Sequence, residues 1–258
     1  MSTPRTLILR APGTNCDRET AYAFERVGAQ TTVVHVQQLL ADPGLLQQFQ
    51  VLCVPGGFSY GDDIAAGRIL GNQMEHHLRG PLREFKDAGK LVLGICNGFQ
   101  VLLKTGLLLD DRSPDSATLT WNGSGKYEDR WVHLASTATP CVFLRNVTTL
   151  YLPVAHAEGK FVTKDATTLT ELAAAGRLPL RYVQADGRHD EPVPYPANPN
   201  GAQANVAGLC DSTGRVFGLM PHPERHIDPT HHPRWTRSRT HGTPDGLAIF
   251  RNAVEFFA

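Results

Sequence analysis

The chain has 258 residues, enough to bury a substantial core as one large α/β domain or as two small ones. Its 25 basic and 25 acidic residues cancel, which argues against the basic surface typical of proteins that bind nucleic acid or anionic membranes. No apolar run reaches the roughly 18 residues of a membrane helix, and the first residues contain too short an apolar stretch for a signal peptide. Five scattered cysteines without a CxxC pair make disulfides unexpected and favour a reducing cytoplasm.

The first 110 residues alternate short apolar runs with helical patterns. Strands are expected at 6–10, 31–36, 51–55 and 91–95, and helices at 17–27, 72–88 and 97–104. Asp17 is the expected N-cap of the first helix, and Gly28 is its expected stop. This alternation predicts a mainly parallel sheet with helices on both sides.

After residue 110 the pattern changes to that of antiparallel strands. Such strands are expected within 118–136 and at 151–156 as an edge addition, with further strands within 180–187, 205–211 and 215–221. The last two are joined by a hairpin turn, and the C-terminal segment has the apolar spacing of an amphipathic helix. No repeat or linker divides the chain, so a single domain over residues 1–258 is expected.

The segment LVLGICNGFQ (91–100) places Cys96 between Gly94 and Gly98, where a strand is expected to turn into a helix. A free cysteine is most often a small buried core residue. However, Gly-x-Cys-x-Gly at such a turn also has the geometry of a nucleophile elbow, whose flanking positions must be small. The elbow would put the sulfur at the carboxyl edge of the sheet and at a helix N-terminus, which favours the thiolate. The short pattern alone leaves both interpretations open.

The segment VFGLMPHPERH (216–226) supplies a candidate base for such a nucleophile. Pro223 biases His222 toward extended backbone, in which residues two apart point the same way. Glu224 is therefore expected to hydrogen-bond one imidazole nitrogen and leave the other free to face a thiol. A surface turn with two solvated polar groups is the alternative for this motif in isolation.

A tetrahedral intermediate also needs preorganised hydrogen-bond donors for its negative charge. The elbow itself would place the backbone N–H of Asn97. A second donor is expected from Gly56–Gly57, which end the strand at 51–55 and permit a close backbone approach.

The segments GICNGFQ, PGGFSYGD and PHPER together resemble the class I (triad-type) glutamine amidotransferases, and more narrowly the amidotransferase subunit that serves phosphoribosylformylglycinamidine synthase. Further segments resemble that family in order: APGTNCDRE (11–19), TLTWNGSGKYEDRWVHL (118–134), AHAEGKF (155–161), RYVQADG (181–187) and YPANPNGA (195–202). The resemblance covers most of the chain. It implies a flavodoxin-like, mainly parallel sheet flanked by helices, with added antiparallel strands.

The resemblance also implies a reaction. The Cys96 thiolate would attack the side-chain amide of L-glutamine, His222 would carry the proton, and Glu224 would orient the imidazole. The N–H groups of Gly57 and Asn97 would hold the oxyanion.

Gln100 lies one helical turn past the nucleophile, where substrate binding and helix packing are both open interpretations.

The implied partners are a separate synthetase subunit, which would receive the ammonia, and a small accessory subunit. No cofactor or metal is expected in this chain. No segment resembles a Walker phosphate loop, so ATP and magnesium are expected on the synthetase. Neither nucleic acid nor membrane is expected as a partner, and the isolated subunit is expected to be weakly active.

Three features depart from the family pattern. Ala157 stands where glycine is common, and Gln184 stands where an acidic residue is frequent. Residues 227–246 are longer and more basic than in the compact bacterial form, which suggests a surface segment or a synthetase interface.

Four other interpretations stay open. The chain could supply ammonia to a different synthetase, act as a cysteine hydrolase or peptidase, or be a non-catalytic regulatory subunit. A metal-binding module is the fourth, and it would use a group of histidines: His222, His226, His231, His232 and His241. The prolines around His222 and the lack of a completing cysteine or carboxylate pair argue against this metal site.

Overall fold

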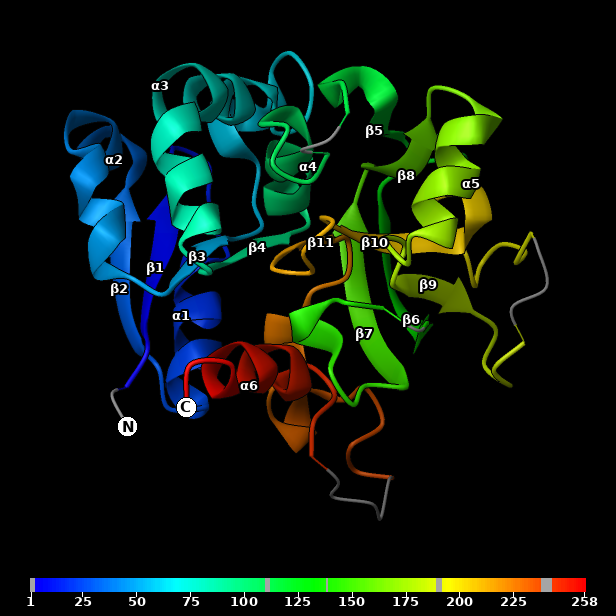
Figure 1. Cartoon of the computed structure of the whole chain (residues 1–258). Coiled ribbons are helices and arrows are strands. Elements are labelled where there is room, and N and C mark those ends of the chain that lie inside the picture. The colour runs from blue at the N-terminus through cyan, green and yellow to red at the C-terminus, as the bar shows by residue number, and fades with distance from the viewer. Residues whose placement is uncertain (1–2, 110–111, 138, 189–191, 238–242) are drawn as a thin grey trace.

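The computed structural model describes residues 3–109, 112–137, 139–188, 192–237 and 243–258. Its main element is a nine-stranded sheet with the order β2-β1-β3-β4-β11-β10-β9-β6-β7 (Figure 1). The strands are β1 (Arg5–Arg10), β2 (Gln30–His35), β3 (Val51–Val54), β4 (Leu91–Ile95), β6 (Glu128–Ser136), β7 (Thr149–His156), β9 (Leu180–Val183), β10 (Val206–Cys210) and β11 (Val216–Leu219).

Helices cover both faces of the parallel half of this sheet. They are α1 (Asp17–Arg26), α2 (Val36–Ala41), α3 (Arg68–Asp87), α4 (Asn97–Lys104) and α6 (Leu247–Glu255). Helix α5 (Ala166–Ala174) lies instead beside the strand β8 (Glu158–Thr163). Short 3-10 turns are η1 (Pro43–Gln48), η2 (Ser59–Asp62), η3 (Pro114–Ser116), η4 (Val142–Leu144), η5 (Gln203–Asn205), η6 (Pro223–Arg225) and η7 (Pro229–His231). Figure 1 shows α3 and α4 on one side of the sheet and α1 and α6 on the other. Strands β3, β4 and β11 are buried at every position because both of their faces are covered.

The sheet has a parallel half and an antiparallel half, as predicted. Neighbouring strands from β2 through β11 run parallel, whereas β10, β9, β6 and β7 each pair antiparallel with their neighbours. One detail differs from the prediction. Strand β5 (Ala117–Trp121) does not extend the large sheet but pairs with β8 (Glu158–Thr163) in a separate two-stranded sheet.

The first helix has the predicted extent but a different N-cap. Cys16 takes the cap position, while Asp17 is the first helical residue and pairs with Arg10 at 3.5 Å. Gly28, at φ 92°, ends the helix as predicted. Helix α3 begins at Arg68, earlier than predicted, directly after Gly67 in a left-handed conformation.

A buried ion pair fixes α3 to the hairpin between β10 and β11. The ammonium of Lys86 lies 3.0 Å from a carboxylate oxygen of Asp211, and both side chains are almost fully covered. Asp211 also accepts the backbone N–H groups of Arg215 and Val216, each at 3.0 Å. This pair connects the helical layer to the strand that precedes the predicted base.

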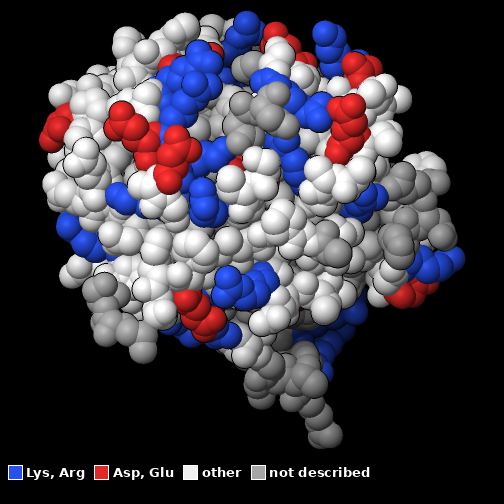
Figure 2. Space-filling model, in the orientation of Figure 1, with Lys and Arg blue, Asp and Glu red and all other residues white. Residues whose placement is uncertain are grey.

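The charges on the surface are mixed. Figure 2 shows basic and acidic side chains interspersed over the face presented there. Among the helices of the described ranges, none combines the length and the apolar character needed to cross a bilayer.

Candidate active site

The predicted site residues follow three adjacent parallel strands. Gly57 lies just after β3, Cys96 directly follows β4, and His222 lies just after β11, and these strands are neighbours in the order β3-β4-β11. Because the carboxyl ends of parallel strands meet at one edge of a sheet, the strand order brings the three segments together. The backbone N–H of Cys96 donates to the carbonyl of Leu219 at 2.8 Å, which joins two of them directly.

Cys96 has the backbone of a nucleophile elbow. Its φ of 51° and ψ of −105° lie where L-residues are strained, between the end of β4 and the first residue of α4. A Cβ on Gly98 would lie 1.8 Å from the carbonyl oxygen of Val54, and one on Gly94 would lie 2.6 Å from a methyl of Leu102. The predicted need for glycine on both sides of the cysteine is therefore confirmed.

The thiol is nearly covered. Cys96 is 5% exposed, and its sulfur lies 3.8 Å from the carbonyl oxygen of Ala155 on β7. Burial alone would fit an ordinary core cysteine equally well. The strained turn after β4 distinguishes this cysteine from the other buried ones, since the imidazole of His222 interacts with Cys16 as well as with Cys96.

The predicted contact between His222 and Glu224 is present. Their Nδ1 and Oε1 atoms are 2.6 Å apart, and both residues are buried. His222 has the extended backbone that was predicted, with φ −104° and ψ 90°, but the chain after it does not stay extended, because Pro223 begins the 3-10 turn η6 and Glu224 lies within it. The N–H of His222 donates to the carbonyl of Pro153 on β7 at 2.8 Å, which fixes the start of this turn.

The charge environment of His222 favours its protonated form. Burial acts to lower the pKa of this imidazole, but the Glu224 carboxylate and then the interactions with the sulfurs of Cys96 and Cys16 outweigh it and raise the pKa well above its usual value. Within the described residues, its Nε2 atom makes no hydrogen bond. This environment therefore favours an imidazole that can accept a proton from a neighbouring thiol.

The two residues expected to supply the oxyanion donors lie just after β3 and at the first position of α4. Gly57 has φ 149°, and a Cβ there would lie 2.8 Å from both the Gly13 oxygen and the Thr14 Cα, so only glycine fits. Neither the N–H of Gly57 nor that of Asn97 donates to another residue in the described ranges. For Asn97 this follows from its place in the first turn of α4, whose amides have no partner inside the helix.

Gln100 is fixed by the protein at both ends of its amide. Its Oε1 accepts from the side chain of Asn97 at 2.9 Å, and its Nε2 donates to the carbonyl of Glu158 at 2.5 Å. The Asn97 Oδ1 in turn accepts the N–H of Ser59 at 3.1 Å. These bonds fit the packing interpretation: Gln100 holds α4, the loop after β3 and the start of β8 together.

Cys16 is a site residue for which the sequence alone suggested no role. It lies just before α1, yet its sulfur accepts an N–H of Arg225 at 3.3 Å and lies close enough to His222 to influence the pKa of that residue. The segment APGTNCDRE resembles the family, and the cysteine within it was the available signal.

His156 at the end of β7 was also missed. Asn122 donates from its Nδ2 to the carbonyls of Lys126 and His156, so its Oδ1 is the acceptor for His156 Nδ1 at 3.2 Å. The His156 Nε2 is buried and has no hydrogen-bond partner among the described residues. Burial, and then the charge of His222, lower the pKa of His156 to about 3. A neutral imidazole is thus buried near the predicted base.

Among the described residues, the histidines considered for a metal site (His222, His226, His231 and His232) do not come together in one group of three ligands. The ring of His226 packs against Trp131 and His232, with centroids 5.1 and 5.9 Å apart, and its Nδ1 bonds to the Tyr151 carbonyl at 2.9 Å. His241 lies outside the described residues.

Ala157 and Gln184, the two single residues that depart from the family pattern, make local backbone hydrogen bonds. The carbonyl of Ala157 accepts the N–H of Asn122 at 2.8 Å, and Gln184 closes a turn with Gly187 and Arg188. Within the described ranges, neither residue hydrogen-bonds to the Cys96, His222 or Glu224 side chains.

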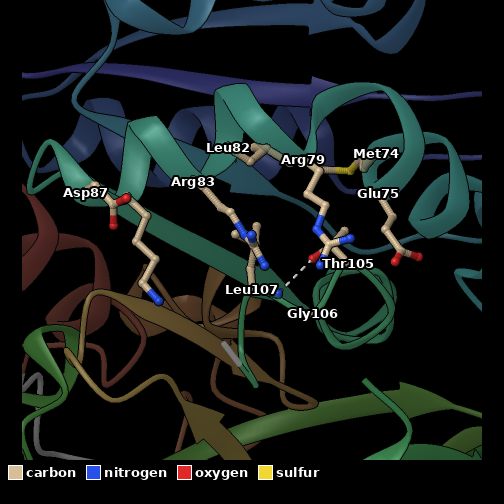
Figure 3. A pocket seen from close by; sticks show the side chains of 10 residues that line it. Met74, Glu75, Arg79, Leu82, Arg83, Asp87, Thr105, Gly106 and Leu107 are labelled. Carbon is tan, nitrogen blue, oxygen red and sulfur yellow. Dashed lines mark hydrogen bonds between the residues drawn. The ribbon is translucent and has the colours of Figure 1, made fainter. Parts of the chain in front are cut away.

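A surface cavity lies at the end of α4 opposite Cys96 (Figure 3). Arg79 and Arg83 reach from α3 toward the Thr105–Leu107 segment there, where Thr105 Oγ1 accepts the N–H of Leu107 at 3.4 Å. The residues lining this cavity are distinct from the predicted site residues.

Comparison with known proteins identifies the class. Residues 3–257 match the family described as the CobB/CobQ-like glutamine amidotransferase domain. The structure of PurLQS from Thermotoga maritima contains a chain that matches with a TM-score of 0.75 and 29% identity, each chain being covered completely. A glutamine amidotransferase from Thermotoga maritima, 14% identical with a TM-score of 0.56, shares the fold; the match covers 99% of this chain and 98% of that one. The fold and the family match define a glutamine amidotransferase domain.

Relatives narrow the assignment. The phosphoribosylformylglycinamidine synthase subunit PurQ of Dehalococcoides mccartyi is 46% identical over 258 residues, which cover 99% of this chain and 98% of the relative. The subunit of the same name from Methanococcus maripaludis is 39% identical, with 98% and 97% covered. The chain belongs to this PurQ family. The matches favour it over a glutaminase for another synthetase and over a cysteine peptidase.

Proposed function

We propose that this chain is the glutaminase subunit of phosphoribosylformylglycinamidine synthase, which releases ammonia from L-glutamine for a synthetase subunit in purine biosynthesis. One observation carries the chemistry. The strained Cys96 after β4 and the hydrogen-bonded His222–Glu224 pair after β11 lie at the ends of adjacent strands. Membership in the PurQ family supports the assignment to purine biosynthesis.

In the first step, the Cys96 sulfur forms a bond to the side-chain amide carbon of glutamine while His222 holds the thiol proton. The amide carbonyl becomes an oxyanion, which accepts the N–H groups of Gly57 and Asn97. Charge that develops in a water-poor site gains most from such fixed donors.

In the second step, the oxyanion collapses and the carbon–nitrogen bond breaks. His222 gives its proton to the leaving nitrogen, so that neutral ammonia departs and a γ-glutamyl thioester stays on Cys96. A water molecule then attacks the thioester with His222 as the base, which yields glutamate and restores the thiol. Glu224 keeps the imidazole in the orientation that both transfers need.

The proposal includes a division of labour between subunits. The synthetase binds ATP and magnesium and consumes the ammonia, and this chain needs no cofactor or metal of its own. The similarity to a chain of the Thermotoga maritima PurLQS structure supports a synthetase partner together with a small accessory subunit. The complex would work in the cytoplasm, and the chain would act as a single domain.

Cys96 is nearly covered in the isolated chain, which supports low activity without the partner. Tyr127 is half exposed, and burial and then the negative charge of Cys96 raise its pKa. We propose that contact with the synthetase moves the segment around Tyr127 and gives glutamine access to Cys96. Glutamate release should therefore rise on adding the synthetase, and equal turnover with and without it would refute this part.

The test of the function is an assay of the assembled complex with two nitrogen sources. Cys96→Ser should abolish glutamine-dependent formation of the amidine while ammonium-dependent formation continues. Cys53→Ala, a change of another buried cysteine, should leave both nearly intact. Glutamine-dependent synthesis by Cys96→Ser above about a tenth of the wild-type rate would contradict the proposal, because a Ser-for-Cys change at a nucleophile costs far more than tenfold.

A further inference from the structure

Three side chains of different chemistry converge beside the proposed base. A sulfur of Cys16, a nitrogen of His222 and a carboxylate oxygen of Glu224 lie within 4.8 Å of one another, and all three residues are buried. Thiolate, imidazole and carboxylate are the ligand types that Zn²⁺ takes in proteins, commonly with a fourth position left for water.

Gly56 packs closely against two of these groups. A Cβ on Gly56 would lie 3.1 Å from the Cys16 sulfur, 2.8 Å from His222 Cε1 and 3.4 Å from His222 Nδ1. The Cε1–Nδ1 edge of the ring and the sulfur therefore both border Gly56, and a larger residue there would push them apart.

Two further observations favour metal binding. The second carboxylate oxygen of Glu224, Oε2, is buried and has no hydrogen bond within the described ranges, although buried polar atoms are almost always paired. Arg225 donates an N–H to the Cys16 sulfur at 3.3 Å, and its charge acts against the burial that raises the pKa of this thiol.

We propose that Cys16, His222 and Glu224 form an inhibitory site for a thiophilic divalent cation, with Zn²⁺ as the representative ion. Binding would replace two protons, the thiol proton of Cys16 and the proton that His222 Nδ1 shares with Glu224, and would change no oxidation state. The bound imidazole could then no longer turn and exchange protons with Cys96. The effect on turnover rests on the proposed function, whereas binding of the ion does not.

The thiolate, imidazole and carboxylate donors distinguish this site from the histidines around His226. They also make it a poor site for hard cations. Mg²⁺ and Ca²⁺ prefer all-oxygen ligands and would find one carboxylate here. The site shares His222 and Glu224 with the catalytic set and differs from it in using Cys16, which approaches from the loop between β1 and α1, in place of Cys96.

The test measures binding of Co²⁺, a spectroscopic substitute for Zn²⁺, by thiolate-to-metal absorption, followed by displacement with Zn²⁺. Wild type, Cys96→Ala and the matched control Cys53→Ala should bind with equal affinity. Cys16→Ala should lose at least about 100-fold in affinity, since even outer contacts of metal sites are worth 10–100-fold. Cys16→Ser, which keeps the size of the side chain, is the second variant should Cys16→Ala fail to fold.

Two outcomes would overturn the site. One is unchanged affinity in both Cys16 variants, and the other is loss of binding in Cys96→Ala alone, which would place the ion on the catalytic pair. In the activity assay, Zn²⁺ should inhibit wild-type glutaminase reversibly with chelator and inhibit the Cys16 variants at least tenfold more weakly. If no glutaminase activity is found at all, the proposed function fails while the cobalt measurement still decides the metal site.

Discussion

Glu224 determines the protonation of His222 from 2.6 Å away. Because both groups are buried, the carboxylate charge is weakly screened and offsets the cost of burying an imidazolium. In the proposed reaction, proton transfer by His222 therefore depends on the charge of Glu224.

Replacing Glu224 by Gln should reduce glutaminase turnover by a factor of about 100 or more, in line with loss of the orienting carboxylate in related triads. Without the carboxylate, burial acts to lower the pKa of His222, so the alkaline limb of the pH–rate profile should move to lower pH. Steady-state kinetics across pH measure both effects. An unchanged profile would show that Glu224 has no part in the proton transfer.

His156 should make the fold sensitive to acid. Its pKa is lowered to about 3 in the folded chain, so its neutral form stabilises the fold fully above the unfolded value near 6.5 and this contribution is lost as pH falls below it. Between pH 7 and pH 5 the loss amounts to about 2 kcal/mol.

Chemical denaturation at the two pH values tests this effect. The difference in unfolding free energy between pH 7 and pH 5 should shrink by about that amount in His156→Gln. His76→Gln, an exposed change on α3, should behave as wild type. An equal pH dependence in all three proteins would contradict the assignment of a buried neutral His156.

For single residues, the sequence predicted Cys96, His222 and Glu224 because each lies in a short motif whose backbone conformation depends on its immediate neighbours. Cys16 and His156 could not be found that way. Their importance arises from positions at the ends of β1 and β7, and local patterns do not show which loops the sheet brings beside β11.

The close packing of α4 against β3 restricts which residue can stand at position 98. Helix α4 starts so close to β3 that Gly98 has no room for a Cβ, whereas Gly80 in α3 has no atom within 4 Å of that position. The same substitution should therefore have opposite effects in the two helices.

Gly98→Ala should destabilise the fold by more than about 3 kcal/mol, because the clash is with backbone and cannot be relieved by a rotamer change. Gly80→Ala should stabilise it by about 0.5–1 kcal/mol through higher helix propensity. Urea denaturation of both variants measures the difference. Equal stability of the two would mean that α4 moves freely relative to β3.

The elements predicted correctly are those with strong, long patterns, such as the central parallel strands and the final helix. Helix α2 has six residues, too few for a periodic signal to stand out. Helix α5 was missed although Asp165 caps it by accepting the N–H of Thr168 at 2.7 Å, a signal that was present in the sequence. The pairing of β5 with β8 depends on a partner about 40 residues away, which strand patterns do not specify.

For the molecule as a whole, the site exists because the strand order sets β4 between β3 and β11. The Lys86–Asp211 pair secures this arrangement by joining α3 to the β10–β11 hairpin. Lys86→Met should cost about 3 kcal/mol or more, because it leaves Asp211 charged and buried without its cation.

Thermal and urea unfolding measure this loss. Arg188→Met, which breaks the exposed pair with Asp186, is the matched control and should leave the unfolding midpoint unchanged. If both variants unfold like wild type, the buried pair does not hold the two layers together.

Covalent labelling with a diazoketone analogue of glutamine, followed by peptide mass mapping, tests the central claim that Cys96 attacks the glutamine amide. We predict one adduct per chain, on Cys96, that is absent in Cys96→Ser and prevented by excess glutamine. An adduct on Cys16, Cys53 or Cys210 that glutamine prevents, with Cys96 unlabelled, would contradict it.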